Sequence, residues 1–250
     1  MTRRAGSRRL LDALRAAMPA LDAERAIAAG EVLVDGAPAT NPRWLLRPGA
    51  QIRHRPHGPL RGETKLGAGL DRFGVDPAGR IALDVGASTG GFTSALLARG
   101  AVRVYAVDAG HGQLLGRLRQ DPRVVNLEST NLGTLDPRLV PDAIGLLTVD
   151  VSYLALGAAV TQLSARLRLA PGAVLLGLVK PMFELRLGEA PTDAARLNQA
   201  IERAAASVRA AGWEVLGTAA SPRPGAGGAV EGWVHGVRGT TGPPLPAGLP

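Results

Sequence analysis

LDVGASTGG, residues 83–91, stands where a short apolar run meets a segment with helical patterning. The run at residues 81–85 predicts a buried strand, and residues 92–100 predict the helix that follows it. Glycines at positions 86, 90 and 91 allow the backbone to approach a ligand closely, and the helix N-terminus offers N–H groups that lack intrahelical partners. We therefore expect a nucleotide-like ligand at this turn, with a tight structural turn as the alternative.

Strand and helix patterns alternate along the chain after this turn. Short runs rich in Val, Leu and Ile predict strands, and amphipathic segments between them predict helices. The alternation predicts a doubly wound α/β sheet that is completed by two late strands paired antiparallel. The expected strands are residues 81–85, 102–108, 123–128, 143–151, 172–181, 213–221 and 228–237, and the expected helices are residues 92–100, 112–121, 156–169 and 192–212.

Two carboxylates stand at the ends of the first two strands. Asp84 lies beside the glycine turn, and Asp108 is placed to accept hydrogen bonds from ribose hydroxyls. The turn differs from the G-x-G-x-x-G pattern of dinucleotide-binding proteins, because three other residues separate Gly86 from Gly90. These features leave two classes open, namely NAD-binding folds and S-adenosylmethionine-dependent methyltransferases.

The fourth and fifth expected strands end in groups that suit catalysis. Asp150 stands at the end of the strand at residues 143–151, and Lys180 stands at the end of the strand at residues 172–181. Ligands of such sheets bind at the carboxyl ends of the strands, so we expect an acid and an amine to face one crevice there. The alternatives are a helix cap for Asp150 and a solvent-reaching side chain for Lys180.

Lysine is rare in this chain. Of 29 Lys and Arg residues, only Lys65 and Lys180 are lysine. An ammonium can lose its proton near neutral pH in suitable surroundings, whereas a guanidinium cannot. The two positions are therefore candidates for a role that arginine does not serve. The alternative is that the two lysines occur at these positions by chance.

The composition excludes several classes of protein. The chain has 250 residues, of which 46% are hydrophobic and 20% charged, so it can bury a proper core. The absence of cysteine excludes disulfides, thiolate metal sites and a cysteine nucleophile, and it fits a reducing cytoplasm. No apolar stretch reaches the length of a membrane-spanning helix, and acidic and basic residues interrupt the first segment, which therefore does not resemble a signal peptide. The four histidines have no ligand spacing, so we expect no metal, and the serines Ser88 and Ser152 lack the histidine pattern of a hydrolase.

Positive charge is concentrated near the N-terminus. Residues 1–61 hold eleven arginines and five acids, which is +6 of the net charge of +8. Helices at residues 8–18 and 23–29 and strands at residues 31–36 and 50–55 predict a compact basic module. Its partner is expected to be a polyanion, nucleic acid first and anionic membrane second, with a generally basic proteome as the alternative. The candidate nucleic-acid contacts are Arg3, Arg4, Arg8, Arg9, Arg25 and Arg43.

Several motifs resemble those of the TlyA family, the ribosomal RNA 2′-O-methyltransferases also called hemolysin A. They are LDVGASTGGFTSALLARGA, VYAVDAGHGQLLGRLRQDPRVVNLESTN (residues 104–131), DVSYLAL and LVKPMFE. The most specific part is VDAGHGQLLGRLRQDPRV together with ESTN. RRLLDAL and ERAIAAGEVLVDG resemble the small RNA-binding domain shared by a ribosomal protein and pseudouridine synthases. The likeness runs from about Arg8 to Arg238.

The resemblance implies roles for particular residues. A Lys-Asp-Lys-Glu catalytic set falls on Lys65, Asp150, Lys180 and Glu231. The cofactor would be S-adenosylmethionine, and its expected contacts are Asp84, Gly86, Ala87, Ser88, Gly90, Gly91, Asp108, Asn131 and Asp150. Two stretches depart from the family pattern: LRGE before Lys65, where relatives carry SRGG, and LRLGEAPTDAAR after Glu184, where relatives carry a Gly-rich basic loop.

The resemblance also implies a fold and an activity. We expect a Rossmann-like class I S-adenosylmethionine-dependent methyltransferase sheet with a small N-terminal α/β RNA-binding domain. The expected boundaries are residues 1–58 for the RNA-binding domain, 59–64 for a linker, 65–239 for the methyltransferase domain and 240–250 for a disordered tail. The implied reaction is cytidine 2′-O-methylation of 16S or 23S ribosomal RNA in the cytoplasm, with ribosomal RNA or subunits as partners and no membrane or metal.

The chemistry leaves two roles open for Lys180. A neutral Lys180 would accept the proton of the ribose hydroxyl, whereas a charged Lys180 would polarise the hydroxyl while Asp150 orients it. Three other functions also remain as alternatives: a non-catalytic RNA-binding or ribosome-assembly factor, a membrane-active haemolysin, and an NAD-dependent oxidoreductase.

Overall fold

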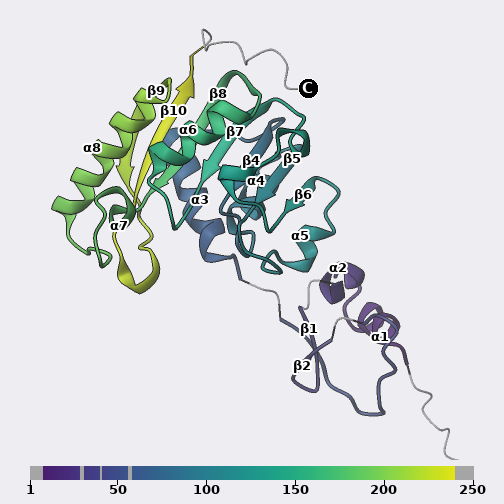
Figure 1. The fold of residues 1–250 in the computed structure, drawn as a ribbon. Coiled ribbons are helices and arrows are strands. Elements are labelled where there is room, and N and C mark those ends of the chain that lie inside the picture. Colours follow the sequence, from purple (N-terminus) through teal and green to yellow (C-terminus); the bar gives the residue numbers. More distant parts are fainter. Residues whose placement is uncertain (1–7, 29–30, 40, 56–57, 240–250) are drawn as a thin grey trace, which may run out of the picture. The chain divides into compact units, whose positions relative to one another are not determined.

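The computed structural model describes residues 8–28, 31–39, 41–55 and 58–239 (Figure 1). The chain forms two compact units. The first comprises Met1–Pro59 and Leu115–Asp121, and the second comprises Leu60–Leu114 and Pro122–Pro250. The expected tail at residues 240–250 lies outside the described residues.

The first unit is a small α/β module. Strand β1 (Val32–Val34) pairs antiparallel with β2 (Ala37–Pro38) and with β3 (Ile52–His54). The hairpin between β1 and β2 turns at Asp35 and Gly36, which both have positive φ, as this type of tight turn requires. Helices α1 (Leu10–Ala17) and α2 (Ala23–Ala28) precede the sheet, and α5 (Gly116–Arg119) also belongs to this unit. The core of this unit includes Leu10, Leu14, Ile27, Val32 and Leu46.

The second unit contains a sheet of seven strands in the order β6-β5-β4-β7-β8-β10-β9 (Figure 1). The first five strands in this order run parallel, and β10 pairs antiparallel with both β8 and β9. This agrees with the predicted doubly wound sheet and its two late antiparallel strands. The strand bounds are β4 (Ile81–Val85), β5 (Arg103–Val107), β6 (Val124–Leu127), β7 (Ile144–Val149), β8 (Leu169–Val179), β9 (Trp213–Ala220) and β10 (Gly232–Arg238).

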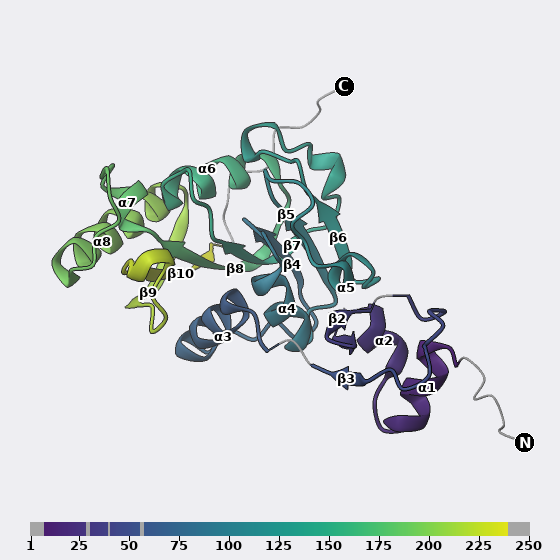
Figure 2. The ribbon, with the colours of Figure 1, turned by 90° about the horizontal axis from the view of Figure 1, so that it is seen from below.

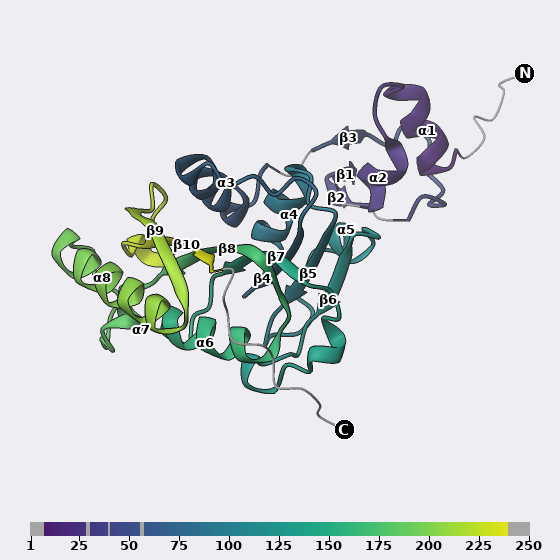
Figure 3. The same ribbon diagram turned by 90° about the horizontal axis from the view of Figure 1, so that it is seen from above.

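Helices cover both faces of this sheet. Figures 2 and 3 show α3 (Arg61–Phe73) and α4 (Gly91–Ala98) against one face, and α6 (Leu156–Arg166) and α8 (Ala194–Ala210) against the other. The turn α7 (Pro181–Glu184) directly follows β8. Short 3-10 turns complete the unit: η1 (Leu132–Thr134), η2 (Pro137–Leu139) and η3 (Ala226–Gly228).

Helix α3 was not expected from the sequence. Its first turn includes residues 61–64, which the sequence analysis assigned to the linker. Glycines at 62, 67 and 69 lower the intrinsic helix propensity of this segment, so tertiary packing must stabilise the helix. A Cβ added at Gly62 would lie 3.2 Å from Gly91 of α4, and one at Gly69 would lie 3.1 Å from the Trp233 ring. The glycines therefore bring α3 close to its neighbours and position the residues that α3 carries.

Other predicted elements differ in length. The helix expected at residues 112–121 is reduced to the four residues of α5. The helix expected at 156–169 ends at Arg166, because β8 begins earlier than expected, at Leu169. Helix α8 begins at Ala194, where the Asp193 side chain caps it by accepting the Arg196 N–H at 2.9 Å.

Candidate active site

Three chemically active side chains lie at one edge of the large sheet. Asp150 follows β7 and Lys180 follows β8, so both stand at the carboxyl ends of parallel strands. Strand β10 runs in the opposite direction, and its first residue, Gly232, pairs with Val179 at the end of β8. Glu231, directly before β10, therefore lies at the same edge as Lys180, directly after β8, although the two strands are antiparallel.

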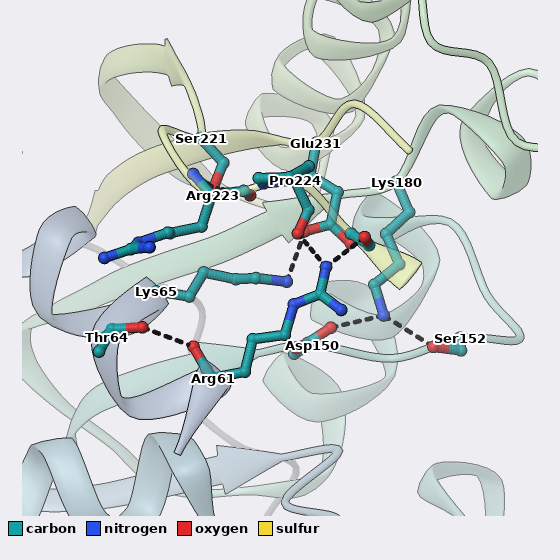
Figure 4. Close-up of polar contacts among 11 residues, drawn as sticks. Arg61, Thr64, Lys65, Asp150, Ser152, Lys180, Ser221, Arg223, Pro224 and Glu231 are labelled. Carbon is teal, nitrogen blue, oxygen red and sulfur yellow. Dashed lines mark hydrogen bonds and ion pairs between the residues drawn. The ribbon is translucent and has the colours of Figure 1, made fainter. Parts of the chain in front are cut away.

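Two ammonium–carboxylate pairs form at this edge (Figure 4). Lys65 reaches in from α3, and its Nζ lies 2.5 Å from Oε2 of Glu231; both side chains are buried. The Nζ of Lys180 lies 2.6 Å from Oδ1 of Asp150 and donates to Oγ of Ser152 at 2.7 Å. All four residues that the resemblance assigned to catalysis thus lie in two direct contacts, and their catalytic role stays a prediction.

Arg61 is a contributor that the sequence analysis missed. It stands four residues before Lys65 and therefore on the same face of α3. Its guanidinium donates to the carbonyl oxygens of Pro224 and Gly225, in the segment that leads to Glu231 (Figure 4). A Cβ at Gly225 would lie only 2.4 Å from Oε1 of Glu231. Arg61 thus binds the segment that contacts the Glu231 carboxylate. Had the helix been predicted, the spacing R-x-x-x-K would have placed Arg61 on the same face as Lys65.

The glycine turn joins three strands of the sheet. The N–H groups of Gly86 and Ala87 donate to the carbonyl of Val107, at 2.9 and 3.1 Å. Gly86 has φ +84°, and a Cβ there would lie 2.2 Å from the carbonyl oxygen of Asp150. Only glycine fits this position, because the clash would be with backbone that cannot move aside. The turn before α4 therefore lies directly against the backbone of Asp150.

Asp108, after β5, contacts this turn, and Asn131 lies beyond the end of the neighbouring strand β6. Oδ2 of Asp108 accepts the Ser88 N–H at 2.8 Å, and Oδ1 accepts the Gly110 N–H at 2.7 Å. A carboxylate has about four lone-pair sites, so these two bonds leave capacity for ribose hydroxyls. Oδ1 of Asn131 accepts the Gly133 N–H at 2.9 Å and so caps η1. Cofactor contacts by Asp108 and Asn131 stay predictions.

Asp84 is fully buried at the end of β4. Its pKa is raised from the ordinary value of 3.8 to about 7, mainly by burial and in smaller part by the nearby charge of Asp150. Hydroxyl groups of Thr93, at 2.7 Å, and Thr148, at 3.2 Å, donate to its carboxyl oxygens and oppose this rise. The buried Asp84 carboxyl therefore links the end of β4 to Thr93 of α4 and Thr148 of β7. Its contact with a cofactor stays a prediction.

The predicted nucleic-acid contacts lie in the first unit. Arg8, Arg9, Arg25 and Arg43 are exposed, and Arg3 and Arg4 lie outside the described residues. Arg8 also lines a surface pocket of about 520 Å³ together with Arg47. The structure thus leaves the four described guanidinium groups accessible to a polyanion, and the pairing of Arg25 with Glu31 is loose, at 3.9 Å.

The described residues include no candidate metal site and no helix that could span a membrane. Within this part of the chain, no three His, Asp or Glu side chains gather in an arrangement that could hold a metal ion. Among the helices of the same residues, none combines the length and apolar character needed to cross a bilayer.

The fold and the site define a class: a methyltransferase sheet joined to a small RNA-binding module. The family model described as FtsJ-like methyltransferase matches residues 60–237, and the model described as S4 domain matches residues 8–52. The chain belongs to the FtsJ-like methyltransferase family, within the TlyA group that combines both domains.

Individual relatives agree with this assignment. A Mycobacterium tuberculosis protein named 16S/23S rRNA (cytidine-2′-O)-methyltransferase TlyA is 39% identical over 218 residues, which cover 82% of this chain and 79% of the relative. The solved structure of a "putative hemolysin" from Streptococcus thermophilus matches with a TM-score of 0.67 at 29% identity, covering 94% of this chain and 90% of that one. The N-methyltransferase NodS from Bradyrhizobium japonicum matches with a TM-score of 0.51 at 14% identity, over 71% of this chain and 97% of that one, which shows a shared fold alone.

Proposed function

We propose that this protein transfers a methyl group from S-adenosylmethionine to a ribose 2′-hydroxyl of ribosomal RNA. The target nucleoside is a cytidine in 16S or 23S RNA, as in the name of the Mycobacterium tuberculosis relative. The observation that carries the proposal is the meeting of two ion pairs, Lys65 with Glu231 and Lys180 with Asp150, at the carboxyl edge of a methyltransferase sheet. The proposed partner places the protein in the cytoplasm.

The residues around the glycine turn fit S-adenosylmethionine. The turn from Gly86 to Gly91 exposes backbone to a ligand, and a side chain at Gly86 would not fit there. The Asp108 carboxylate has lone pairs left for the ribose hydroxyls. Asn131 would lie on the adenine side. When bound, the cofactor supplies a methyl group on a positively charged sulfur, which makes that carbon a good electrophile. The backbone contact between Gly86 and Asp150 would hold this group close to the catalytic pairs.

The contacts of Lys180 favour its charged role. A lysine ammonium has three N–H donors. Ser152 accepts one of them and Asp150 forms an ion pair with the ammonium at 2.6 Å, which leaves a donor for the oxygen of the ribose hydroxyl. In this role Lys180 holds the oxygen in line for attack and stabilises the negative charge that develops on it. The carboxylate of Asp150, next to the same oxygen, orients the hydroxyl and receives its proton.

The other pair completes the site from α3. Lys65 and Glu231 are both buried, so each charge depends on its partner for solvation. We propose that this pair keeps a second positive charge near the reacting oxygen and fixes α3 against β10. The exposed arginines of the first unit would bind RNA phosphates.

Methyl transfer from labelled S-adenosylmethionine to isolated ribosomal subunits tests the proposal. Mass mapping of ribose methyl marks on ribosomal RNA from cells with and without the protein would identify the nucleotide. We expect a 2′-O-methyl mark that depends on the protein. Binding of the cofactor without any transfer would contradict the proposal and favour a non-catalytic assembly factor, and preferential binding of NAD would favour an oxidoreductase.

A further inference from the structure

Glu184 is a buried carboxylate that the proposed reaction does not use. It lies at the end of the turn α7, four residues after Lys180, and its Oε1 accepts the Leu156 N–H at 2.5 Å. The pKa of this carboxyl is raised, chiefly by burial, and the bond from Leu156 opposes the rise. Burying a carboxylate costs free energy unless hydrogen bonds replace its lost water, so the bond to Leu156 is central to what Glu184 does.

Glu184 caps helix α6 from another segment of the chain. The helix begins at Leu156, and its N-cap residue is Ala155, whose side chain makes no capping hydrogen bond. The first N–H groups of a helix lack intrahelical partners and carry partial positive charge, so a carboxylate stabilises this end. Glu184 thus does for α6 what Asp193 does for α8 from the N-cap position itself.

Two hydrogen bonds join the same two segments. One segment follows β7 and leads into α6, and the other follows β8 and forms α7. Nζ of Lys180 donates to Oγ of Ser152 at 2.7 Å, and the Leu156 N–H donates to Glu184 (Figure 4 shows the first of these bonds). Each bond joins residues that are 28 positions apart, so the two bonds are parallel connections between the segments, separated by four residues on each side.

The turn α7 couples Glu184 to Lys180. The N–H groups of Phe183 and Glu184 donate to the carbonyl oxygen of Lys180, at 3.0 and 3.2 Å. Pro181 occupies the first position of the turn, where its fixed φ suits a helical start. Side chains four residues apart on such a turn lie on the same face. A shift of Glu184 would therefore shift Lys180 as well.

The start of α6 also lies close against β8. A Cβ added at Gly177 would lie only 2.5 Å from Cδ1 of Leu156. The missing side chain lets Leu156 approach the strand whose end carries Lys180. This packing contact and the bond to Glu184 fix the spacing between α6 and the end of β8 from two sides.

We propose that Glu184 is a positioning residue: by binding the start of α6, it sets the distance between the Lys180 ammonium and the Asp150 carboxylate. The inference deepens the proposed function and rests on it, because this distance matters for the reaction only if Lys180 and Asp150 act on the ribose hydroxyl. Misplacing a reacting group by about 1 Å can slow a reaction by about 100-fold. Loss of the bond should therefore affect the reaction step more than the binding of either substrate.

The rarity of lysine allows the surroundings of Lys180 to be measured directly. The chain contains only Lys65 and Lys180, so protein made with isotope-labelled lysine gives two side-chain signals in NMR spectra. The signal that disappears in Lys180→Arg belongs to Lys180. We expect Glu184→Ala to shift this signal and to leave the Lys65 signal in place.

Ser164→Ala is the control for a general loosening of α6. It removes the acceptor of the Trp213 Nε1–H, at 3.0 Å, two turns further along the same helix. We expect it to lower the melting temperature while leaving both lysine signals and kcat close to those of the unaltered protein. Glu184→Ala should lower kcat for transfer to ribosomal subunits by about tenfold or more, with KM and cofactor affinity little changed.

Two conservative variants separate the length of the side chain from its charge. Glu184→Gln keeps the length and an acceptor oxygen for the Leu156 N–H, so it should restore most of kcat and the original Lys180 signal. Glu184→Asp keeps the charge but is one methylene shorter, so it should behave as Glu184→Ala does. Both changes are small, and they answer the question even where Glu184→Ala fails to fold.

Three results would overturn the inference: an unshifted Lys180 signal in Glu184→Ala or Glu184→Asp, an equal loss of kcat in Ser164→Ala, or normal transfer by Glu184→Asp together with slow transfer by Glu184→Gln. A wild-type protein that produces no 2′-O-methyl mark would instead overturn the proposed function. The lysine signals do not depend on methyl transfer, so the two failures are distinguishable.

Discussion

Lys180 is the residue at which the chemistry can be tested most directly. Its ammonium already contacts Asp150 and Ser152, and the proposed role uses a further N–H for the ribose oxygen. We expect Lys180→Met to slow single-turnover methyl transfer by about 100-fold or more, because a charged donor to the developing oxyanion is lost. Lys180→Arg keeps a charged donor and should recover part of that loss.

The same pair of variants separates the two roles of this lysine. A guanidinium cannot act as a base near neutral pH. If Lys180→Arg is as slow as Lys180→Met while both bind the cofactor normally, the charged role is wrong and a neutral Lys180 that accepts the proton is supported.

Asp84 makes a prediction about pH and stability. Its pKa is about 7 in the folded protein and 3.8 ordinarily, so the folded state keeps a proton that the unfolded chain releases between these values. The folded state therefore binds more protons in this window, and the free energy of unfolding falls as the pH rises through it. The whole effect is about 4 kcal/mol at most, since one unit of pKa corresponds to about 1.4 kcal/mol.

Replacing Asp84 by asparagine isolates this effect. Thr148 donates to the carbonyl oxygen of Leu83 as well as to Asp84, so its hydroxyl oxygen can accept an N–H from an asparagine. We expect the melting temperature of Asp84→Asn, relative to the unaltered protein, to rise as the pH increases from about 4 to about 7. A difference that stays constant with pH would show that the carboxyl is ionised in the folded state throughout.

At the scale of elements, the contact between α3 and α4 decides where Lys65 lies. A Cβ at Gly91 would meet the Cα of Gly62 at 2.7 Å, and both atoms belong to helix backbones that cannot shift independently. We expect Gly91→Ala to destabilise the protein by about 1–3 kcal/mol through overpacking and to reduce methyl transfer. Gly67→Ala, on the same helix α3, is the control: its Cβ would meet only the flexible end of Arg99 at 3.5 Å.

The control variant Gly67→Ala should change the stability of the protein in the opposite direction. Alanine in a helix interior is favoured over glycine by roughly 0.5–1 kcal/mol, so Gly67→Ala should raise the melting temperature. Equal melting temperatures for Gly91→Ala and Gly67→Ala would show that α3 does not depend on close backbone contact with α4.

The segment before β10 depends on Arg61 in the same manner. Its guanidinium bonds to the Pro224 and Gly225 carbonyls, and that segment touches Glu231. We expect Arg61→Ala to lower kcat by about tenfold with little change in cofactor affinity, since the effect is on the position of Glu231, a proposed catalytic group. Arg61→Lys should restore part of kcat, and a loss confined to cofactor affinity would contradict this positioning role.

Much of this arrangement could be predicted from the sequence, and the part that could not has a physical cause. Parallel strands end at one edge, so Asp150 and Lys180 could be placed together from the strand pattern alone. Lys65 could not, because α3 contains three glycines and is stabilised by packing that a local pattern does not record. Glu231 required the antiparallel pairing of β10 with β8, a contact between distant segments. Arg61 was missed together with the helix that carries it.

At the scale of the whole molecule, the distribution of charge predicts how RNA binding responds to salt. The first 61 residues hold +6 of the net charge of +8, and Arg8, Arg9 and Arg43 are exposed there. Each phosphate contact releases counterions and adds about 0.7–0.9 to the slope of log affinity against log salt concentration. Replacing these three arginines by glutamine should therefore reduce the slope by about 2–3 in titrations of ribosomal RNA.

A charge-matched control distinguishes a localised RNA-binding surface from a merely basic protein. Arg72, Arg196 and Arg209 are exposed in the second unit, and replacing all three by glutamine changes the net charge by the same amount. If net charge alone attracted RNA, both triple variants would lose the same slope, because non-specific attraction depends on the summed charge. If the first unit holds the phosphates, only its own variant should lose slope. That variant should also need more RNA for half-maximal methyl transfer while reaching the same rate at saturation, since its active site is unaltered.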